Sequence, residues 1–199
     1  MDLLLEKTDS EIISLSLIEP RRFEVIFDRH FASIHGYFSR REGSQMADDL
    51  SALVFMKAFE LRERYMSEND NCLPWLYGIS SKILSVSRRT KKRHFYRDQR
   101  AHEKYKTETI TFDSNDGIYT SHECELIHSA LMSLKRTERE VILLLAWEQL
   151  TYPEIAFALG IPIGTVKSRI NRARKTLMHV LTDFSFDDKV SFIPSTTTS

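Results

Sequence analysis

Apolar and aromatic residues recur at steps of three and four along most of this chain, the spacing that places side chains on one face of an α-helix. The first long stripe of this kind comprises Phe23, Ile26, Phe27, His30, Phe31, Ile34 and Phe38. Gly43 interrupts it, and a second apolar face follows within residues 48–64. Pro74 suits the first turn of a third helix, because proline lacks the N–H that a first turn leaves unbonded. Residues 21–100 are therefore predicted to form a helical domain.

A second group of helices is predicted over residues 123–182. Its first stripe comprises Leu126, Ile127, Ala130 and Leu134. Thr137 and Glu140 then have the spacing of a capping box at a helix start. The remaining elements are a buried helix over 141–147, a short helix over 152–159, a turn at Gly160-Ile161-Pro162 and a last helix over 163–181.

The segments outside these domains lack helical periodicity. Residues 1–20 are an N-terminal extension, and residues 101–122, with their turn-like Asn-Asp-Gly117, are predicted to be a flexible linker. Residues 183–199 end in Ser-Thr-Thr-Thr-Ser and are predicted to be disordered. The chain has only 6 glycines and 5 prolines, which favours helices over a turn-rich β protein. The predicted fold class is all-α, with two small helical domains joined by a flexible linker.

The formal net charge of zero hides two basic segments. Residues 82–106 contain ten lysines and arginines against two acidic residues, and residues 164–175 contain five basic residues and no acidic one. A charge run alone is equally compatible with a solvated surface. Two separate basic patches on a neutral chain favour two contacts with one polyanion, such as a nucleic acid.

Several classes of protein are disfavoured by what the sequence lacks. No apolar run reaches the roughly 18–20 residues that span a membrane, and the N-terminus has no signal-peptide pattern. We therefore expect a cytoplasmic protein without stable membrane insertion. Cys72 and Cys124 are isolated and are predicted to be reduced thiols. The histidines do not pair with cysteine or carboxylate residues at metal-ligand spacing, so no metal site and no cofactor is expected.

An enzyme acting on nucleic acid is one alternative. Asp48 and Asp49 are a pair of carboxylates, but adjacent residues of a helix point about 100° apart and do not form one metal site. No glycine-rich phosphate loop is present. The sequence therefore predicts a binding protein rather than an enzyme.

Two short helices joined by a tight turn containing glycine are typical of a DNA-binding helix-turn-helix. In the second helix, Val166, Ile170, Ala173 and Leu177 share one face, which is predicted to be buried. The side chains predicted to point away from it and toward base edges or phosphates are Lys167, Ser168, Asn171, Arg172 and Lys175. Arg169 and Arg174 flank the apolar stripe and are predicted to contact phosphate. A helix that simply packs, with a basic outer surface, is the competing interpretation.

Residues 134–174 closely resemble region 4 of the sigma-70 family of bacterial RNA polymerase sigma factors, above all its extracytoplasmic-function (ECF) group. The run Gly164-Thr-Val-Lys-Ser-Arg169 and the following Arg172-Ala-Arg174 carry this resemblance. Residues 47–59 resemble region 2.2, and residues 74–93 resemble regions 2.3 and 2.4. The segments occur in the order found in the family.

The resemblance implies a factor that binds the clamp and flap of core RNA polymerase and recognises two elements of promoter DNA. It implies that region 4 recognises the −35 element through Thr165, Lys167, Ser168, Arg169, Asn171, Arg172 and Lys175. It implies that region 2 recognises and melts the −10 element through Asn69, Asp70, Asn71, Lys82, Arg88 and Arg89. It assigns Asp48, Asp49, Leu50 and Phe55 to the polymerase clamp. Many such proteins are held inactive by an anti-sigma factor, so a regulatory protein partner is also expected.

The sequence departs from the family pattern in region 2. Ala52, Leu53 and Val54 replace polar residues, and Lys82 replaces an asparagine. This leads to the hypothesis that Leu53 and Val54 belong to a surface that another protein covers when the factor is idle. Cys72 lies in the loop assigned to the −10 element, where a role in sensing oxidants is left open. A stand-alone helix-turn-helix regulator is the alternative function, and it predicts an N-terminal sensor or dimerisation domain and symmetric operators.

Overall fold

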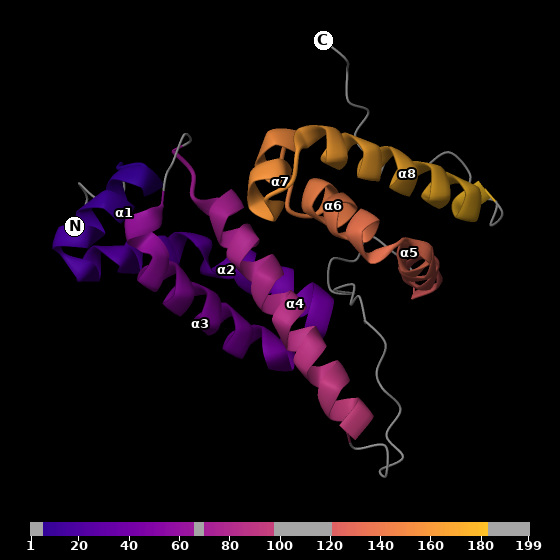
Figure 1. Ribbon diagram of the computed structural model, residues 1–199, viewed down its shortest axis with the longest axis horizontal. Coiled ribbons are helices and arrows are strands. Elements are labelled where there is room, and N and C mark those ends of the chain that lie inside the picture. The colour runs from indigo at the N-terminus through magenta and orange to yellow at the C-terminus, as the bar shows by residue number, and fades with distance from the viewer. Residues whose placement is uncertain (1–5, 66–69, 98–120, 183–199) are drawn as a thin grey trace. The chain divides into compact units, whose positions relative to one another are not determined.

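The computed structural model describes residues 6–65, 70–97 and 121–182, and the regular secondary structure in those ranges is entirely helical (Figure 1). The chain divides into two compact units, Met1–Thr111 and Phe112–Ser199. The all-α prediction is confirmed. Residues 101–120 of the predicted linker, the predicted tail 183–199 and Asn69 lie outside the described residues.

The helices of the first unit are α1 (Asp9–Ile18), η2 (Pro20–Phe23), α2 (Glu24–Glu42), α3 (Ser44–Leu61), η3 (Arg62–Arg64) and α4 (Leu73–Arg97). Those of the second unit are α5 (Ser121–Ser133), α6 (Arg136–Ala146), α7 (Tyr152–Leu159) and α8 (Ile163–Thr182). In the described parts of the chain, no helix is both long enough and apolar enough to cross a membrane.

A hairpin of α2 and α3 forms the centre of the first unit. Gly43 connects the two helices with φ at 84°, a positive value that glycine adopts without strain. Phe23 packs edge-on against Phe59 with ring centroids 5.5 Å apart, and Phe27 meets Phe55 at 4.9 Å. Because residue numbers rise on one helix as they fall on the other, α2 and α3 run antiparallel.

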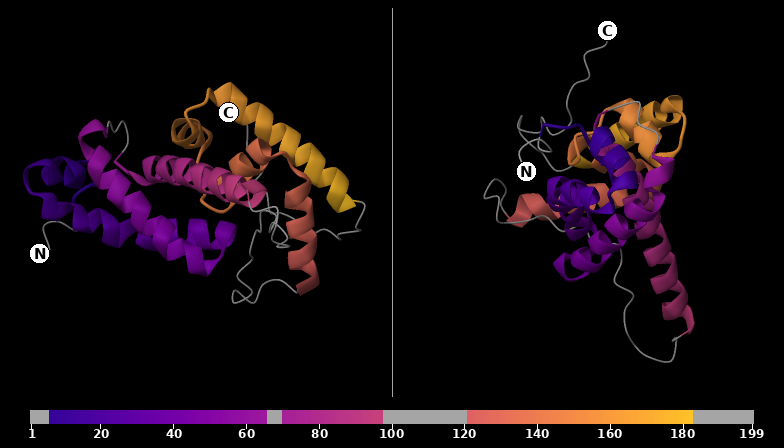
Figure 2. Two further views of the ribbon diagram at one scale, coloured as in Figure 1. Left: turned by 60° about the horizontal axis from the view of Figure 1, so that its bottom comes forward. Right: turned by 90° about the vertical axis from the view of Figure 1, so that its left-hand side faces the viewer.

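The long helix α4 packs against this hairpin and is uninterrupted in both views of Figure 2. Tyr37 of α2 and Tyr77 of α4 contact each other inside the core, with ring centroids 5.6 Å apart. Further along, Glu42 accepts hydrogen bonds from Arg88 and Lys91, each at 2.7 Å. The basic half of α4 is therefore tied to the end of α2.

Helix α1 was not predicted by the periodicity of the sequence. A capping box begins it: the Glu11 N–H donates to the Thr8 hydroxyl at 3.3 Å, and the Thr8 N–H donates to the Glu11 carboxylate at 2.8 Å. Ile12 and Ile13 are buried in the core of the first unit, whereas Ile18 is exposed. This helix makes part of the expected N-terminal extension a packed element.

In the second unit, the predicted capping box at Thr137 and Glu140 is wrong. Helix α6 begins at Arg136, and its cap Lys135 makes no side-chain hydrogen bond to the first turn. The carbonyl of Lys135 instead accepts the N–H groups of Glu138 and Arg139, each at 2.9 Å, which places Thr137 inside the helix. A capping box is found at the start of α7, between Thr151 and Glu154.

Candidate nucleic-acid interface

The turn between α7 and α8 has the geometry of a helix-turn-helix. Gly160 adopts the left-handed conformation (φ 61°, ψ 41°), and the N–H of Ile161 closes α7 by donating to the Ala156 carbonyl at 3.0 Å. Pro162 then starts α8, because its carbonyl accepts the N–H groups of Thr165 and Val166 at 2.8 and 3.2 Å. These bonds confirm the predicted turn and fix the direction in which α8 leaves it.

Helix α8 has the two faces that the sequence predicted. Val166, Ile170 and Ala173 are fully buried, and Leu177 is nearly so. The predicted DNA-contacting side chains divide by exposure: Lys167, Asn171, Arg172 and Lys175 are exposed, while Thr165, Ser168 and Arg169 are half-buried. The exposed set carries amide, ammonium and guanidinium donors, the groups that bind base edges and phosphates.

Arg172 is held by a residue that the sequence analysis did not connect to it. Its Nε donates to Oε1 of Glu138 on α6 at 3.0 Å. Glu138 is 6% exposed, whereas the Arg172 side chain is 58% exposed. A buried carboxylate therefore orients a guanidinium whose remaining N–H donors face outward. The partners are 34 positions apart in the sequence, so no local pattern predicts this pair.

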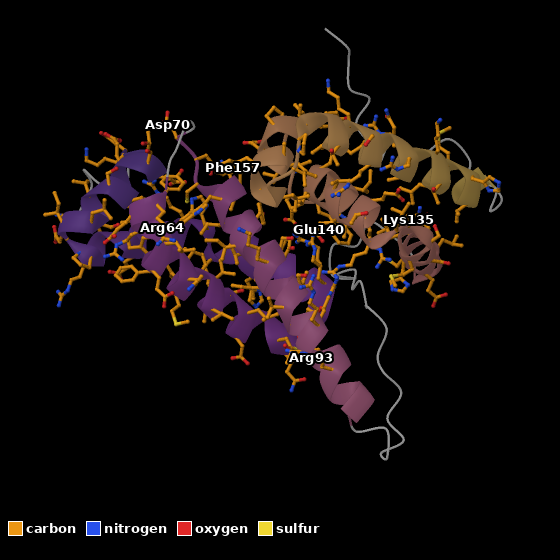
Figure 3. The ribbon with its side chains drawn as sticks, viewed as in Figure 1. Arg64, Asp70, Arg93, Lys135, Glu140 and Phe157 are labelled. Carbon is orange, nitrogen blue, oxygen red and sulfur yellow. The ribbon has the colours of Figure 1, made fainter. Side chains whose placement is uncertain are left out.

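In the first unit, the segment before α4 presents polar groups beside an aromatic pair. Asp70 and Asn71 are exposed, and Figure 3 shows Asp70 at the loop that precedes α4. The Asn71 side-chain oxygen accepts the Leu73 N–H at 2.9 Å, which helps to start the helix. Tyr65 and Trp75 bracket the segment, with ring centroids 4.9 Å apart. Tyr65 was missed by the sequence analysis, because only the fold returns the chain to Trp75.

The basic side chains of α4 differ in how free they are to bind a strand. Lys82 and Arg89 are exposed, and Arg93 is exposed near the far end of the helix (Figure 3). Arg88 does not fit the predicted role: its side chain is 14% exposed, and its Nε donates to Glu42 at 2.7 Å. Because its side chain is mostly buried and bonded to Glu42, Arg88 is better described as part of the α2–α4 packing.

The predicted polymerase-binding residues of α3 also divide by burial. Asp48 and Asp49 are exposed, and Asp48 lies 3.1 Å from His35. Leu50 and Phe55 are 7% and 4% exposed, so they belong to the core beneath that surface and cannot form its outer contacts. The assignment of these two side chains as direct contacts is therefore corrected.

The hypothesis of a covered surface at Leu53 and Val54 is half wrong. Val54 is fully buried inside the first unit, so no partner can reach it. Leu53 is 39% exposed, and Met56, three residues further along α3, is 54% exposed. The exposed large apolar side chains of α3 are therefore Leu53 and Met56.

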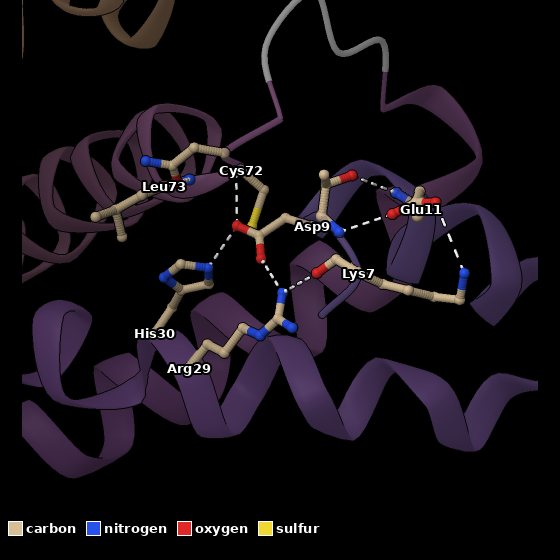
Figure 4. A network of polar contacts seen from close by, with 9 residues as sticks. Lys7, Asp9, Glu11, Arg29, His30, Cys72 and Leu73 are labelled. Atoms are coloured by element: carbon tan, nitrogen blue, oxygen red, sulfur yellow. Dashed lines mark hydrogen bonds and ion pairs between the residues drawn. The ribbon is translucent and has the colours of Figure 1, made fainter. Parts of the chain in front are cut away.

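Asp9 is the centre of a polar network that joins three segments of the first unit (Figure 4). Its Oδ2 accepts from Nε2 of His30 at 2.7 Å and from the N–H of Cys72 at 3.0 Å, and its Oδ1 accepts from Arg29 at 2.9 Å. Burial by itself raises the pKa of the Asp9 carboxyl. The hydrogen bonds from His30, Cys72 and Arg29, together with the charge of His30, outweigh it and hold the pKa well below the ordinary value.

The Asp9 network also determines the environment of the Cys72 thiol. The side chain is fully buried, and burial together with the neighbouring Asp9 carboxylate raises the pKa of its thiol far above the ordinary value. Because the thiolate is the reactive form, this environment opposes oxidant sensing. The structure also brings His30 together with an aspartate and a cysteine, a grouping that spacing along the sequence does not show.

The chain is similar to known proteins along both units. A family model described as Sigma-70, region 4 matches residues 124–177. The ECF RNA polymerase sigma factor SigW of Bacillus subtilis is 30% identical over 146 residues, covering 69% of this chain and 76% of SigW. The ECF RNA polymerase sigma factor EcfG of Rhodopseudomonas palustris is 28% identical over 149 residues, covering 72% and 78%. These alignments are longer than the second unit, so they extend into the first.

The fold is also similar to that of a solved structure. The sigma factor RpoE of Bartonella quintana, solved in complex with the anti-sigma factor NepR, matches with a TM-score of 0.64 and 23% sequence identity. The match covers 81% of this chain and 98% of RpoE. This likeness shows that the two proteins have the same fold.

Proposed function

Because this chain belongs to the ECF family of RNA polymerase sigma factors, we propose that its two units divide promoter recognition between them. The second unit reads the −35 element through α8. The first unit binds the core polymerase through α3 and engages the −10 element through the segment before α4 and the exposed cations of α4. The chain acts in the cytoplasm as a binding factor, without cofactor or catalytic chemistry of its own.

The division of α8 into two faces is the observation that carries the −35 assignment. Val166, Ile170 and Ala173 are fully buried, so the helix presents one fixed face outward. Lys167 and Asn171 are on that face, near the N-terminal half of the helix, which is the part that enters a major groove in helix-turn-helix proteins. Arg172 adds a guanidinium whose direction Glu138 sets.

Three features of the first unit support the −10 assignment. Asp70 and Asn71 offer exposed acceptors and donors for a base edge. Trp75, half-buried against Tyr65, offers an aromatic face beside them. Lys82 and Arg89 are exposed cations further along the same helix, where they can hold the backbone of a separated strand. Asn69 remains part of the proposal, although it lies outside the described residues.

Contact with the core polymerase clamp is assigned to the exposed surface of α3. Asp48 and Asp49 supply negative charge, and Leu53 and Met56 add exposed apolar side chains. A surface that combines charge with an apolar centre suits a protein partner. We assign contact with the polymerase flap to the second unit. We also propose regulation by an anti-sigma factor, since RpoE of Bartonella quintana was solved bound to one.

Run-off transcription with purified core polymerase on genomic fragments tests this proposal. Defined start sites should appear only when both the chain and the core polymerase are present. Gel-shift assays on the same promoters distinguish the proposed function from a stand-alone regulator, because a sigma factor of this group should bind promoter DNA specifically only together with the polymerase. Specific binding of symmetric sites by the chain alone would instead identify a stand-alone regulator.

A further inference from the structure

Helix α1 is bonded to the segment before α4 through a single residue. The N–H of Asp9 donates to the Asp70 carbonyl at 3.0 Å, and the Asp9 carboxylate accepts the Cys72 N–H at 3.0 Å. Asp9 therefore binds the main chain on both sides of the exposed Asn71. Both bonds are made to main-chain atoms, so they set the path of the backbone rather than the pose of one side chain.

Asp9 is itself held rigidly by α2. Two adjacent residues, Arg29 and His30, donate to its two carboxylate oxygens at 2.9 and 2.7 Å. Arg29 also donates to the Lys7 carbonyl at 2.9 Å, so the approach to α1 is fixed as well. Any displacement of the carboxylate costs several charge-assisted hydrogen bonds at once.

The carboxylate is not needed to start α1. Thr8 caps the helix through its own side chain, and Glu11 completes the capping box. Packing does not require a charge here either, because apolar residues of similar size usually stabilise a core as well as a buried ion pair does. What this network provides is a fixed connection between α1, α2 and the segment Asp70–Leu73.

We propose that Asp9 is a positioning residue for −10 recognition, which holds the segment Asp70–Leu73 where it can bind an unstacked base. The inference rests on the function proposed above for this segment. A pocket for a flipped base must be held in place by supporting contacts, because small displacements weaken both its hydrogen bonds and its stacking. Asp9 provides such support from outside the segment and does not touch the DNA.

A metal ion is the competing explanation for this cluster. Asp9, His30 and Cys72 each offer a ligand atom, and these atoms lie within 4.8 Å of one another. However, both oxygens of Asp9 already accept hydrogen bonds, and the guanidinium of Arg29 lies against the same carboxylate. A metal ion would be repelled by Arg29 and would have to replace the hydrogen bond between His30 and Asp9, so the network is better explained as a positioning device.

The test compares the full-length Asp9→Asn chain with a matched control, Glu19→Gln. Each change turns an acid of the α1 region into its amide and weakens one ion pair with an arginine. Asp9 pairs with Arg29 at 2.9 Å, and Glu19 pairs with Arg22 at 2.8 Å. Only Asp9 touches the segment before α4. His30→Leu removes the hydrogen bond from His30 Nε2 to Asp9, and it serves if Asp9→Asn does not fold. Cys72→Ser keeps the main-chain N–H and should behave as the unsubstituted chain.

The readout is discrimination between −10 sequences by reconstituted holoenzyme. Transcription is measured on a promoter from the run-off screen and on versions with one −10 base changed. The unsubstituted chain should prefer the natural base by about tenfold. Asp9→Asn and His30→Leu should lower this ratio to about threefold or less, whereas Glu19→Gln should leave it unchanged. Simple destabilisation lowers activity on both templates equally and does not move the ratio.

The outcomes separate the inference from the function on which it rests. If the unsubstituted holoenzyme shows no dependence on the −10 sequence, the proposed function of the segment fails. If it discriminates and Asp9→Asn discriminates equally well, the positioning role of Asp9 is wrong. Tight binding of Zn²⁺ by the unsubstituted chain that Asp9→Asn abolishes would also overturn it, in favour of a metal site.

Discussion

Arg172 of α8 is paired with the buried Glu138 of α6 at 3.0 Å, so the helix that packs against α8 also orients one of the exposed side chains of α8. A long arginine side chain samples many rotamers when free, and ordering it on binding costs free energy. The pair reduces that cost before DNA is bound. Geometry therefore singles out Arg172 from the other exposed cations of α8 as the best candidate for reading a base.

Replacing Arg172 by alanine should weaken discrimination within the −35 element by about 1–3 kcal/mol at one base pair, because a bidentate contact to that base is lost. Holoenzyme binding to a set of promoters with single −35 changes measures the effect. Lys175→Ala is the control, because Lys175 is an exposed cation one turn further along α8. An equal loss on every sequence after Arg172→Ala would reassign Arg172 to phosphate.

Replacing Glu138 by glutamine should give a weaker form of the same effect. The amide still accepts a hydrogen bond from Arg172 but loses the charge that restrains it. We expect a smaller loss of discrimination at the same base pair, about 1 kcal/mol or less. Changes at a different position in the −35 element would show that Glu138 does not act through Arg172.

The sequence predicts best the features that depend on residues close to one another along the chain. Helix α7 and the start of α8 lie where the periodicity and Gly160 placed them, because one glycine at the end of a helical stripe fixes the turn. The buried face of α8 follows from the same periodicity. The capping boxes at Thr8 and Thr151 are equally local signals. Thr137 has the same spacing to a glutamate but lies inside α6, where the carbonyl of Lys135 accepts the N–H groups of the first turn.

The features that the sequence did not predict depend on tertiary contacts. The partner of Arg172 is 34 residues away, and that of Arg88 is 46 residues away. No spacing rule connects these partners, so the sequence alone predicts Arg88 to be a DNA-binding cation. Asp9 meets Cys72 across 63 residues, for the same reason. The burial of Leu50, Val54 and Phe55 within α3 was not predicted either, because likeness to a family marks important positions without separating core from surface.

Charge reversal at Asp49 should reduce binding to core polymerase by about tenfold or more without unfolding the protein, since the side chain is exposed and the contact surface is acidic. Titration of labelled chain with core polymerase measures the affinity, and thermal unfolding checks the fold. Glu63→Lys makes the same charge change on η3 and should bind normally. Equal binding by Asp49→Lys and the control would remove α3 from the interface.

Replacing Leu53 by aspartate should weaken the binding of any protein partner that covers the exposed surface of α3. The free energy of unfolding should change little, because the side chain is 39% exposed. Val54→Asp is the contrasting variant and should unfold the first unit, since Val54 is fully buried. Holoenzyme formation and regulation in cells are the two measurements. If Leu53→Asp leaves both unchanged, neither the polymerase nor an inhibitor uses this surface.

The Asp9 network should make the first unit sensitive to acid. The pKa of Asp9 is depressed in the folded chain, so its contribution to stability is present above the unfolded value near 3.9 and is lost as pH falls through the folded value. Asp9→Asn should therefore lower the free energy of unfolding by about 3 kcal/mol at pH 5. The difference from the unsubstituted chain should shrink steadily below about pH 4, where the unfolded carboxyl takes up a proton. Denaturant unfolding at pH 5, 4 and 3 measures this, and a difference that stays constant over the range would show that the charge of Asp9 contributes nothing.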